Sequence, residues 1–210
     1  MERSEKVLAD HPVNQVRRSR GELPATTIWL FWGTGAIPDM PSFQQVYGLN
    51  AAMTSGVDLL RGLARIMGMT ILELPGVTDG LDNDYASQIN GALKALKQQD
   101  MVVIHVESPD EAGHSGNVDE KVRAIESIDR EMVGRLLTWF GSDLRVLIMP
   151  DHPTSIKTRT HTADPVPFLF WGSGFRANGA LRFSESEGRK TNLIIDPGYN
   201  IMEKLIQRGA

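Results

Sequence analysis

The sequence predicts an α/β fold in which a mostly parallel sheet carries helices on both faces. Three short apolar runs have the composition of strands buried on both sides; they are residues 101–106, 144–149 and 166–170. Longer segments with apolar residues at helical spacing lie between and around these runs. Such an alternation of strands and helices is typical of a parallel sheet covered by helices.

The first part of the chain should hold two helices and one strand. Residues 1–22 are polar and are expected to form one helix, and the β-rich residues 26–32 follow it. Further on, apolar side chains recur at helical spacing: Val57, Leu60, Leu63 and Met67. They predict a helix over residues 55–67, and Gly68 is a natural stop because glycine tolerates the left-handed conformation that ends many helices.

The central segment continues the alternation. We expect a strand at residues 69–74, a helix at about 83–98 and a strongly apolar strand at 101–106. Residues 107–116 are expected to be a loop, because Pro and Gly punctuate them.

A long helix dominates the second half. Asn117 stands three residues before Glu120, which is the spacing of a capping box, so the helix should begin there. Apolar residues step along one of its faces: Val118, Val122, Ile125, Ile128, Met132 and Leu136. The two later strands follow, and a helix at residues 192–208 is expected to close the chain.

The composition excludes several classes of function. With a net charge of −4 over 210 residues, the chain lacks the basic surplus of a protein that binds nucleic acid or an anionic membrane. No apolar run approaches the length of a membrane span, and residues 1–20 are too polar for a signal peptide, so we expect a cytoplasmic protein. Because the chain has no cysteine, histidine and carboxylate side chains must hold any metal.

Carboxylate and imidazole side chains gather after the predicted strands of the second half. They are Asp110, His114, Asp151, His152 and His161. The first four fall at the carboxyl ends of strands, where open α/β sheets bind their ligands. Oxygen and nitrogen donors that converge from several loops are the ligands of divalent ions such as Zn²⁺, Mn²⁺ or Mg²⁺. The sequence therefore predicts a metal centre.

The spacing of these residues suits a pair of ions. Asp110 and His114 are four residues apart, so both can face one ion from a tight turn or a first helical turn, and Gly113 permits a sharp backbone there. Asp151 and His152 are adjacent and would point to opposite sides of an extended segment. They could serve two ions separately, or grip one ion together from a bent loop.

Structural roles stay open for single residues. One Asp or His at a strand end is often a turn former or a helix cap. His105 lies within an apolar run, where we expect a hydrogen-bonded core histidine or a partner that orients a metal ligand.

Longer motifs connect these residues to a known family. They are His11–Asn14 with Arg17 and Arg18, Trp29–Gly35, Pro41–Phe43, Tyr47–Leu49, Leu74–Gly76, His105–Glu107, Pro109–His114, Pro150–Thr154 and Thr160–Phe168. Together and in this order they resemble the archaeal-type cofactor-independent phosphoglycerate mutases, a branch of the alkaline phosphatase superfamily. The resemblance runs through nearly the whole chain and implies an alkaline-phosphatase-like core, present in part.

The resemblance implies roles for the metal motifs. Asp110, His114 and His161 would ligate one divalent ion, and Asp151 and His152 would serve a second. The ions would be Mn²⁺ or Mg²⁺, although Zn²⁺ and Co²⁺ also suit such ligands. In the family, a Ser or Thr nucleophile takes the phosphoryl group of 3-phosphoglycerate and returns it to the 2-hydroxyl, which gives 2-phosphoglycerate.

The resemblance also implies two parts. Residues 1–50 would be the tail of an inserted substrate-binding domain, and residues 51–210 the carboxyl-terminal part of the metal-binding core. His11, Arg17 and Arg18 are candidates for holding the substrate, because a guanidinium fork suits carboxylate and phosphate. A solvated helix face is the alternative for these three residues.

The chain departs from the family in length. Family members are much longer, and their first half carries the nucleophile and an early Asp ligand. No counterpart is found here, since Thr54 and Ser55 lie at a strand–helix junction where the family has no nucleophile. We therefore expect a carboxyl-terminal half that is inactive alone and forms homo-oligomers through exposed strand edges and an apolar face.

Two alternatives stay open. Other enzymes of the superfamily share the metal motifs, among them phosphatases, phosphodiesterases, phosphopentomutases and proteins labelled phosphonopyruvate decarboxylase, although the motif from His11 to Arg18 favours the mutase. The second alternative is a truncated module that binds metal without catalysis.

Overall fold

The computed structural model describes residues 1–30, 35–140 and 144–206. The chain divides into two compact units, Met1–Asp39 and Met40–Ala210. Among the described residues, no helix combines the length and apolar character that crossing a membrane requires.

The first unit holds two short helices, α1 (Glu2–Ala9) and α2 (Pro12–Ser19). The prediction of one helix over residues 1–22 is therefore wrong. The physical reason is Pro12, because proline disfavours helical geometry in the residue before it, and His11 adopts an extended ψ of 136°. Residues 26–30 form no strand, and residues 31 and 32 of the predicted β-run lie outside the described residues.

Asn14 holds the first unit together. Its side chain is 1% exposed. The amide nitrogen donates to the carbonyl oxygens of Leu8 (2.6 Å) and Ala25 (2.7 Å), and the amide oxygen accepts from the Ala25 N–H (2.8 Å). One side chain thus ties both helices to the segment that follows, as buried polar groups require partners.

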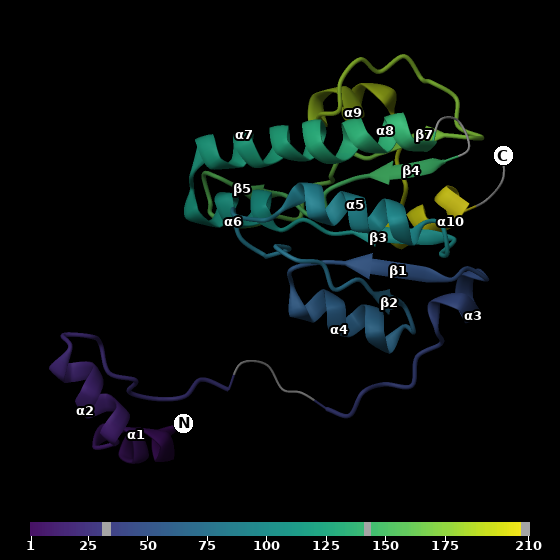
Figure 1. Cartoon of the computed structure of the whole chain (residues 1–210). Helices are drawn as coiled ribbons and strands as arrows, with labels where there is room; N and C mark the ends of the chain where they lie inside the picture. The colour runs from purple at the N-terminus through teal and green to yellow at the C-terminus, as the bar shows by residue number, and fades with distance from the viewer. Residues whose placement is uncertain (31–34, 141–143, 207–210) are drawn as a thin grey trace. The chain divides into compact units, whose positions relative to one another are not determined.

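The second unit is built on a parallel sheet with the order β2-β1-β3. Its strands are β1 (Ala51–Thr54), β2 (Thr70–Ile71) and β3 (Met101–Ile104). The β1–α4–β2 crossover and the β2–α5–β3 crossover run in opposite directions across the sheet. Because such crossovers are right-handed, α4 (Asp58–Ile66) and α5 (Tyr85–Ala95) lie on opposite faces (Figure 1).

The α/β class is confirmed, but the later strands are not parallel. β4 (Arg145–Ile148) pairs antiparallel with β7 (Leu169–Gly172). The segment between them holds a second antiparallel pair, β5 (Thr154–Ser155) with β6 (Thr160–His161), in place of a crossover helix. A parallel pair needs such a crossover, so the connection itself explains why these two strands are antiparallel beside the parallel sheet that the sequence predicts.

Residues 108–115 form a helix where a loop was predicted. Helix α6 (Ser108–Ser115) has Pro109 in its first turn and two acidic residues, Asp110 and Glu111, beside it. Proline and carboxylates favour the amino-terminal end of a helix. Gly116, with a φ of +74°, ends α6 in the left-handed conformation.

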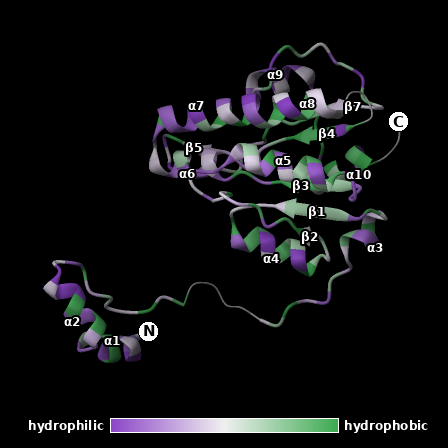
Figure 2. Cartoon of the chain, in the orientation of Figure 1, coloured by the Kyte–Doolittle hydropathy of each residue, from purple (hydrophilic) through white to green (hydrophobic). Residues whose placement is uncertain are grey.

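A long helical run follows α6. It consists of α7 (Val118–Ser127), the π-helix η1 (Ile128–Val133) and α8 (Gly134–Phe140). The Asn117 side chain accepts from the Glu120 N–H at 3.2 Å, so the predicted helix start is confirmed. Figure 2 shows hydrophilic residues along the outward side of α7.

Two apolar clusters form the core of the second unit. One gathers Phe43 of α3 (Phe43–Tyr47) with residues of β1 and α4, and the other gathers Ile89 and Leu93 of α5 with Met132. The closing helix is shorter than predicted for residues 192–208: α9 (Glu185–Thr191) ends before that segment, the 3-10 turn η3 (Gly198–Asn200) and α10 (Ile201–Ile206) lie in it, and residues 207 and 208 lie outside the described residues. Pro197 separates them, since proline begins helices and interrupts them elsewhere.

Candidate metal centre

Three of the predicted ligands meet at one point. Asp110 and His114 lie on one face of α6, with 3.2 Å between Asp110 Oδ2 and His114 Nε2. His161 of β6 approaches the other carboxylate oxygen, with 3.4 Å between its Nε2 and Asp110 Oδ1. The two imidazole Nε2 atoms are 3.1 Å apart. The spacing of four residues therefore places both side chains together, as expected from the sequence.

These separations fit ligands of one divalent ion. Donors bound at about 2.0–2.2 Å from an ion lie roughly 3.0–3.5 Å from one another in tetrahedral or octahedral geometry. The three observed distances of 3.1, 3.2 and 3.4 Å fall in this range, but the two carboxylate oxygens of Asp110 each face a different imidazole, so one ion would be held with both oxygens or after a small turn of the carboxylate. One carboxylate and two imidazoles are also a donor set that Mn²⁺, Zn²⁺ and Co²⁺ accept.

His152 and Asp151 form the second part of the cluster. The His152 ring stacks on His161 with 3.7 Å between centroids, and its Nδ1 lies 4.0 Å from Asp110 Oδ1. Asp110, His152 and His161 form a group whose ligand atoms all lie within 4.8 Å. Asp151 is more remote: its side chain is 68% exposed and reaches His152 Nε2 at 3.2 Å. The two neighbours thus face each other from a bend, rather than pointing to opposite sides.

Two further residues hold the ligands in place. The Thr154 side chain is buried, donates to Asp110 Oδ1 and lies 3.2 Å from His152 Nδ1. The Arg159 carbonyl oxygen lies 3.0 Å from His114 Nδ1. Because a carbonyl only accepts, Nδ1 carries the proton and the Nε2 lone pair of a neutral His114 faces Asp110, which is the form that binds a metal.

Sequence reasoning assigned no role to Thr154 or Arg159. Thr154 belongs to the Pro150–Thr154 motif, and its place two residues after His152 was the available signal. Arg159 acts through its backbone, so its side chain gave no signal. The hairpin formed by β5 and β6 brings both to the ligands.

Gly113 lets α6 approach the hairpin. A Cβ at this position would lie 2.7 Å from the Thr154 carbonyl oxygen and 2.8 Å from its Cγ2. The Lys121 ammonium group donates to the same carbonyl at 2.5 Å. The glycine is therefore needed for close packing within a helix, rather than for the sharp backbone predicted from the sequence.

His105 lies beside the candidate metal ligands and contacts two side chains. Its Nδ1 is 3.0 Å from Ser55 Oγ, and its Nε2 is 3.2 Å from Glu107 Oε2. Burial lowers the pKa of His105, although the nearby carboxylates of Asp151 and Asp110 oppose the shift. Burial raises the pKa of Glu107, and the same two carboxylates add to that shift. His105 is thus a hydrogen-bonded, largely buried histidine, as expected.

In the metal-free protein, we expect His105 to make stability depend on pH. The pKa of His105 is lower in the folded state than in the unfolded state. The contribution of His105 to the free energy of unfolding is therefore complete above its unfolded-state pKa of about 6.5, and it is lost as the pH falls through its folded-state pKa. Wild type should therefore lose free energy of unfolding relative to His105→Gln between about pH 7 and pH 5. The raised pKa of Glu107 changes the stability with pH in the opposite direction, but both proteins keep Glu107, so the difference between them reports on His105. Urea unfolding in EDTA measures the difference, and a constant difference over this range would contradict the expectation.

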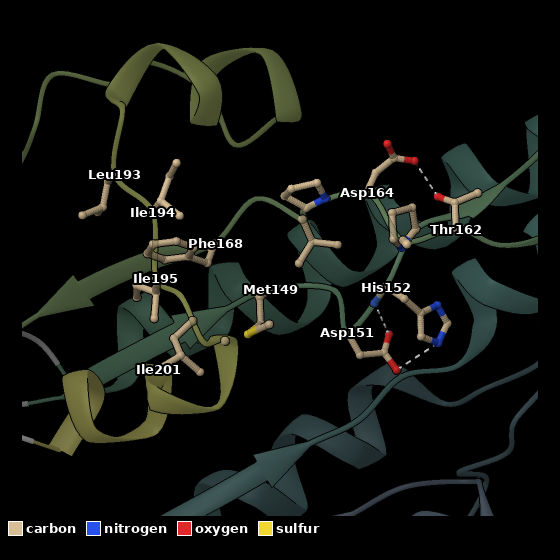
Figure 3. Close-up of a pocket in the computed structure, with 15 residues that line it drawn as sticks. Met149, Asp151, His152, Thr162, Asp164, Phe168, Leu193, Ile194, Ile195 and Ile201 are labelled. Atoms are coloured by element: carbon tan, nitrogen blue, oxygen red, sulfur yellow. Dashed lines mark hydrogen bonds and ion pairs between the residues drawn. The ribbon is translucent and has the colours of Figure 1, made fainter.

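A pocket of about 380 Å³ adjoins Asp151 and His152. Figure 3 shows its two ends: apolar side chains such as Phe168 and Ile195 line one, and Asp151, His152 and Asp164 line the other. Thr162 Oγ1 donates to Asp164 Oδ2 at 2.8 Å on the polar side. The cluster is therefore open to a small ligand along this side.

The candidate substrate residues lie in the first unit. His11 caps α2, where its Nδ1 accepts from the Val13 N–H at 3.3 Å. Arg17 Nε donates to the Leu23 carbonyl (2.7 Å), and its guanidinium pairs with Glu22 at 3.3 Å. Arg18 donates to the Ala9 carbonyl at 3.0 Å. All three side chains thus make contacts within the first unit, as expected if they belong to a solvated helix face rather than to a substrate site.

The chain belongs to the Metalloenzyme superfamily, whose sequence pattern matches residues 8–202. Among its relatives are cofactor-independent phosphoglycerate mutases. The 2,3-bisphosphoglycerate-independent phosphoglycerate mutase of Methanothrix thermoacetophila is 44% identical over 209 residues, which cover 98% of this chain and 53% of the relative. A probable mutase of the same kind from Geobacter sulfurreducens is 41% identical, covering 99% of this chain and 53% of the relative.

Solved structures agree with this placement. A protein from Pyrococcus horikoshii superposes with a TM-score of 0.81 at 30% identity, over 98% of this chain and 55% of that protein. The cofactor-independent phosphoglycerate mutase of Thermoplasma acidophilum gives 0.66 at 29% identity, over 98% and 49%. The family resemblance and the α/β class are confirmed, and the chain spans about half the length of the relatives it matches.

Proposed function

We propose that this chain carries the metal centre of a phosphoglycerate mutase that interconverts 3-phosphoglycerate and 2-phosphoglycerate. The convergence of Asp110, His114 and His161 at the distances of ligands around one ion carries the proposal. Support comes from the relatives named as cofactor-independent mutases at 41–44% identity. The reaction would be a transfer of the phosphoryl group within one glycerate, in the cytoplasm.

We assign two divalent ions to the centre, Mn²⁺ or Mg²⁺, with Zn²⁺ and Co²⁺ as alternatives. Asp110, His114 and His161 would hold the first ion, and Asp151 and His152 would serve the second. Bound divalent ions supply stabilisation of charge on a transferring phosphoryl group and activation of a hydroxyl nucleophile. The residues of this chain do the positioning: Thr154 and the Arg159 carbonyl fix Asp110 and His114.

The Ser or Thr nucleophile and the remaining ligands of the second ion would come from an amino-terminal half like that of the relatives. We propose residues 1–50 as the end of the inserted substrate domain, with His11, Arg17 and Arg18 facing the phosphate or carboxylate of the glycerate. Residues 51–210 would then be the carboxyl-terminal part of the metal-binding core. The chain alone would be inactive.

A chimera tests the proposed function. The matching half of the Methanothrix thermoacetophila mutase is replaced by residues 1–210, and conversion of 3-phosphoglycerate is measured with Mn²⁺ present. We expect turnover, and loss of turnover in the same chimera with Asp110→Asn. A folded chimera that binds Mn²⁺ but releases carbon dioxide from phosphonopyruvate, and leaves 3-phosphoglycerate unchanged, would contradict the mutase assignment.

The isolated chain should self-associate. Large apolar side chains are exposed in the second unit, among them Ile194 (81%) and Leu193 (54%) at the pocket rim. Among the described strands, β2 lies at an edge of its sheet and pairs with β1 alone, and open edges and apolar patches favour association. Light scattering should give at least twice the mass of 23.2 kDa. A monodisperse monomer at micromolar concentration would contradict this prediction.

A further inference from the structure

We propose that Ser55 and His105 are positioning residues that hold the Glu107 carboxylate at the metal centre, where Glu107 increases the affinity for a divalent ion. The inference rests on the proposed function, because it concerns the same centre. It adds the Glu107 carboxylate to the ligands that the sequence motifs predict. It also assigns a positioning role to Ser55, which is not the nucleophile.

The strand register brings Ser55 and His105 together. Thr54 and Ile104 are paired at the carboxyl ends of β1 and β3. Ser55 and His105, which directly follow these strand ends, are therefore also adjacent, and the His105 N–H donates to the Thr54 carbonyl at 3.0 Å. Ser55 Oγ then lies 3.0 Å from His105 Nδ1. This contact follows from the parallel pairing itself.

The hydrogen bonds have a defined direction. An ionised Glu107 carboxylate only accepts, so the proton of a neutral His105 lies on Nε2 and Nδ1 accepts from Ser55 Oγ, which itself accepts from the Val57 N–H at 3.0 Å. An imidazole that accepts at Nδ1 carries its proton on Nε2 when neutral. Nε2 therefore donates to Glu107 Oε2, 3.2 Å away. The sequence of donors runs from the backbone through Ser55 and His105 to the carboxylate.

Ser55 is not suited to act as a nucleophile in this arrangement. It is 5% exposed, and its oxygen already accepts a backbone N–H. A nucleophile must be reachable by the substrate, and the burial of Ser55 prevents this. The hydrogen bonds that link Ser55, His105 and Glu107 therefore orient the Glu107 carboxylate and do not activate the Ser55 hydroxyl.

A buried network fixes the backbone of His105 as well. Gln88 is fully buried and donates to the His105 carbonyl oxygen at 2.8 Å. Asn83, 6% exposed, donates to Gln88 Oε1 at 3.0 Å, and its own oxygen accepts from the Thr78 N–H at 3.1 Å. Fully satisfied polar networks of this kind rigidify a site. The loop of residues 78–83, helix α5 and β3 therefore all contribute to the placement of His105.

Glu107 points to the centre rather than away from it. Its side chain is 24% exposed, and its carboxylate groups with those of Asp110 and Glu111 so that one oxygen of each lies within 4.8 Å of the others. Asp110 belongs to the ligand set described above. Glu111, which is exposed on the same helix, has no ion pair or side-chain hydrogen bond among those found for the described residues. The two glutamates are thus a matched pair: equal charge, but one is held by His105.

Titration of the 210-residue chain with Mn²⁺ by calorimetry tests the inference. We expect Glu107→Gln to weaken binding by about 10- to 100-fold, the range seen when partners of metal ligands are removed. Ser55→Ala and His105→Gln should each weaken it by roughly tenfold while Glu107 is retained. Glu111→Gln, which removes the same charge, should change the affinity by less than about threefold.

The outcomes separate the inference from the proposed function. A purely structural role for Ser55 and His105 would lower the melting temperature of their variants and leave Mn²⁺ affinity unchanged, which would overturn the inference. Equal losses in Glu107→Gln and Glu111→Gln would also overturn it, because general charge would then explain both. If Asp110→Asn abolishes binding while Glu107→Gln binds as wild type, the proposed centre stands and the inference fails. A wild-type chain that binds no Mn²⁺ would contradict both.

Discussion

Asp110→Asn should abolish the stabilisation of this chain by divalent ions. Asp110 is the residue on which the cluster converges, since His114, His161 and Thr154 all contact its carboxylate. An ion that binds only the folded state adds about 2.7 kcal/mol at a free concentration of 100 times its dissociation constant. For a chain of this size, that corresponds to a rise in melting temperature of about 5–10 °C. The variant should show no rise with Mn²⁺.

The metal-free variant should remain folded. An asparagine oxygen can still accept from Thr154, and the substitution removes one negative charge near Glu107 and Asp151. Its melting temperature in EDTA should therefore be close to that of wild type. Asp119→Asn is the matched control, because Asp119 is an exposed residue in the first turn of α7, and its response to Mn²⁺ should be retained. An undiminished response in Asp110→Asn would show that the ion binds elsewhere.

Gly113→Ala should damage both the fold and the centre. The added Cβ would lie 2.7 Å from the Thr154 carbonyl oxygen, which belongs to backbone and cannot turn aside. Helix α6 and the β5–β6 hairpin must then move apart, which separates Asp110 and His114 from His161. Overpacking of this kind costs about 1–3 kcal/mol. We expect this loss in urea unfolding without metal, and a further loss of affinity for Mn²⁺.

Gly62→Ala is the control for this substitution. Gly62 lies in α4, and a Cβ there would meet nothing within 4 Å. An exposed glycine within a helix is less favourable than alanine by about 1 kcal/mol, so this variant should gain stability and bind Mn²⁺ normally. A Gly113→Ala protein with the stability and affinity of wild type would contradict the close packing of α6 on the hairpin.

Much of the core of the fold was predictable because its signals are local. Apolar runs and helical spacing predicted the strand at residues 101–104 and the helices that begin at residues 58 and 85, whereas the central strand β1 (Ala51–Thr54) was not predicted. The direction of β4 and β7 was not predictable in the same way. It depends on how residues 149–168 connect the two strands, and the short hairpin within that segment gives no periodic pattern.

The clustering of the candidate metal ligands was also predictable, but the residues that hold these ligands in place were not. Asp110 and His114 are four residues apart in the chain, so even the unpredicted helix α6 keeps them on one face. Thr154, the Arg159 carbonyl and the link from Ser55 to Glu107 depend on contacts between distant segments. Such contacts follow from strand register and hairpin geometry, which a single sequence does not specify.

The most direct test of the central claim is the position of a bound ion. Crystals of the 210-residue chain grown with Mn²⁺ would give an anomalous difference map at the manganese absorption edge. We predict a peak about 2.0–2.3 Å from a carboxylate oxygen of Asp110 and from the Nε2 atoms of His114 and His161. Manganese bound only at other carboxylates, with His114 and His161 still in contact with each other, would contradict the account of this centre.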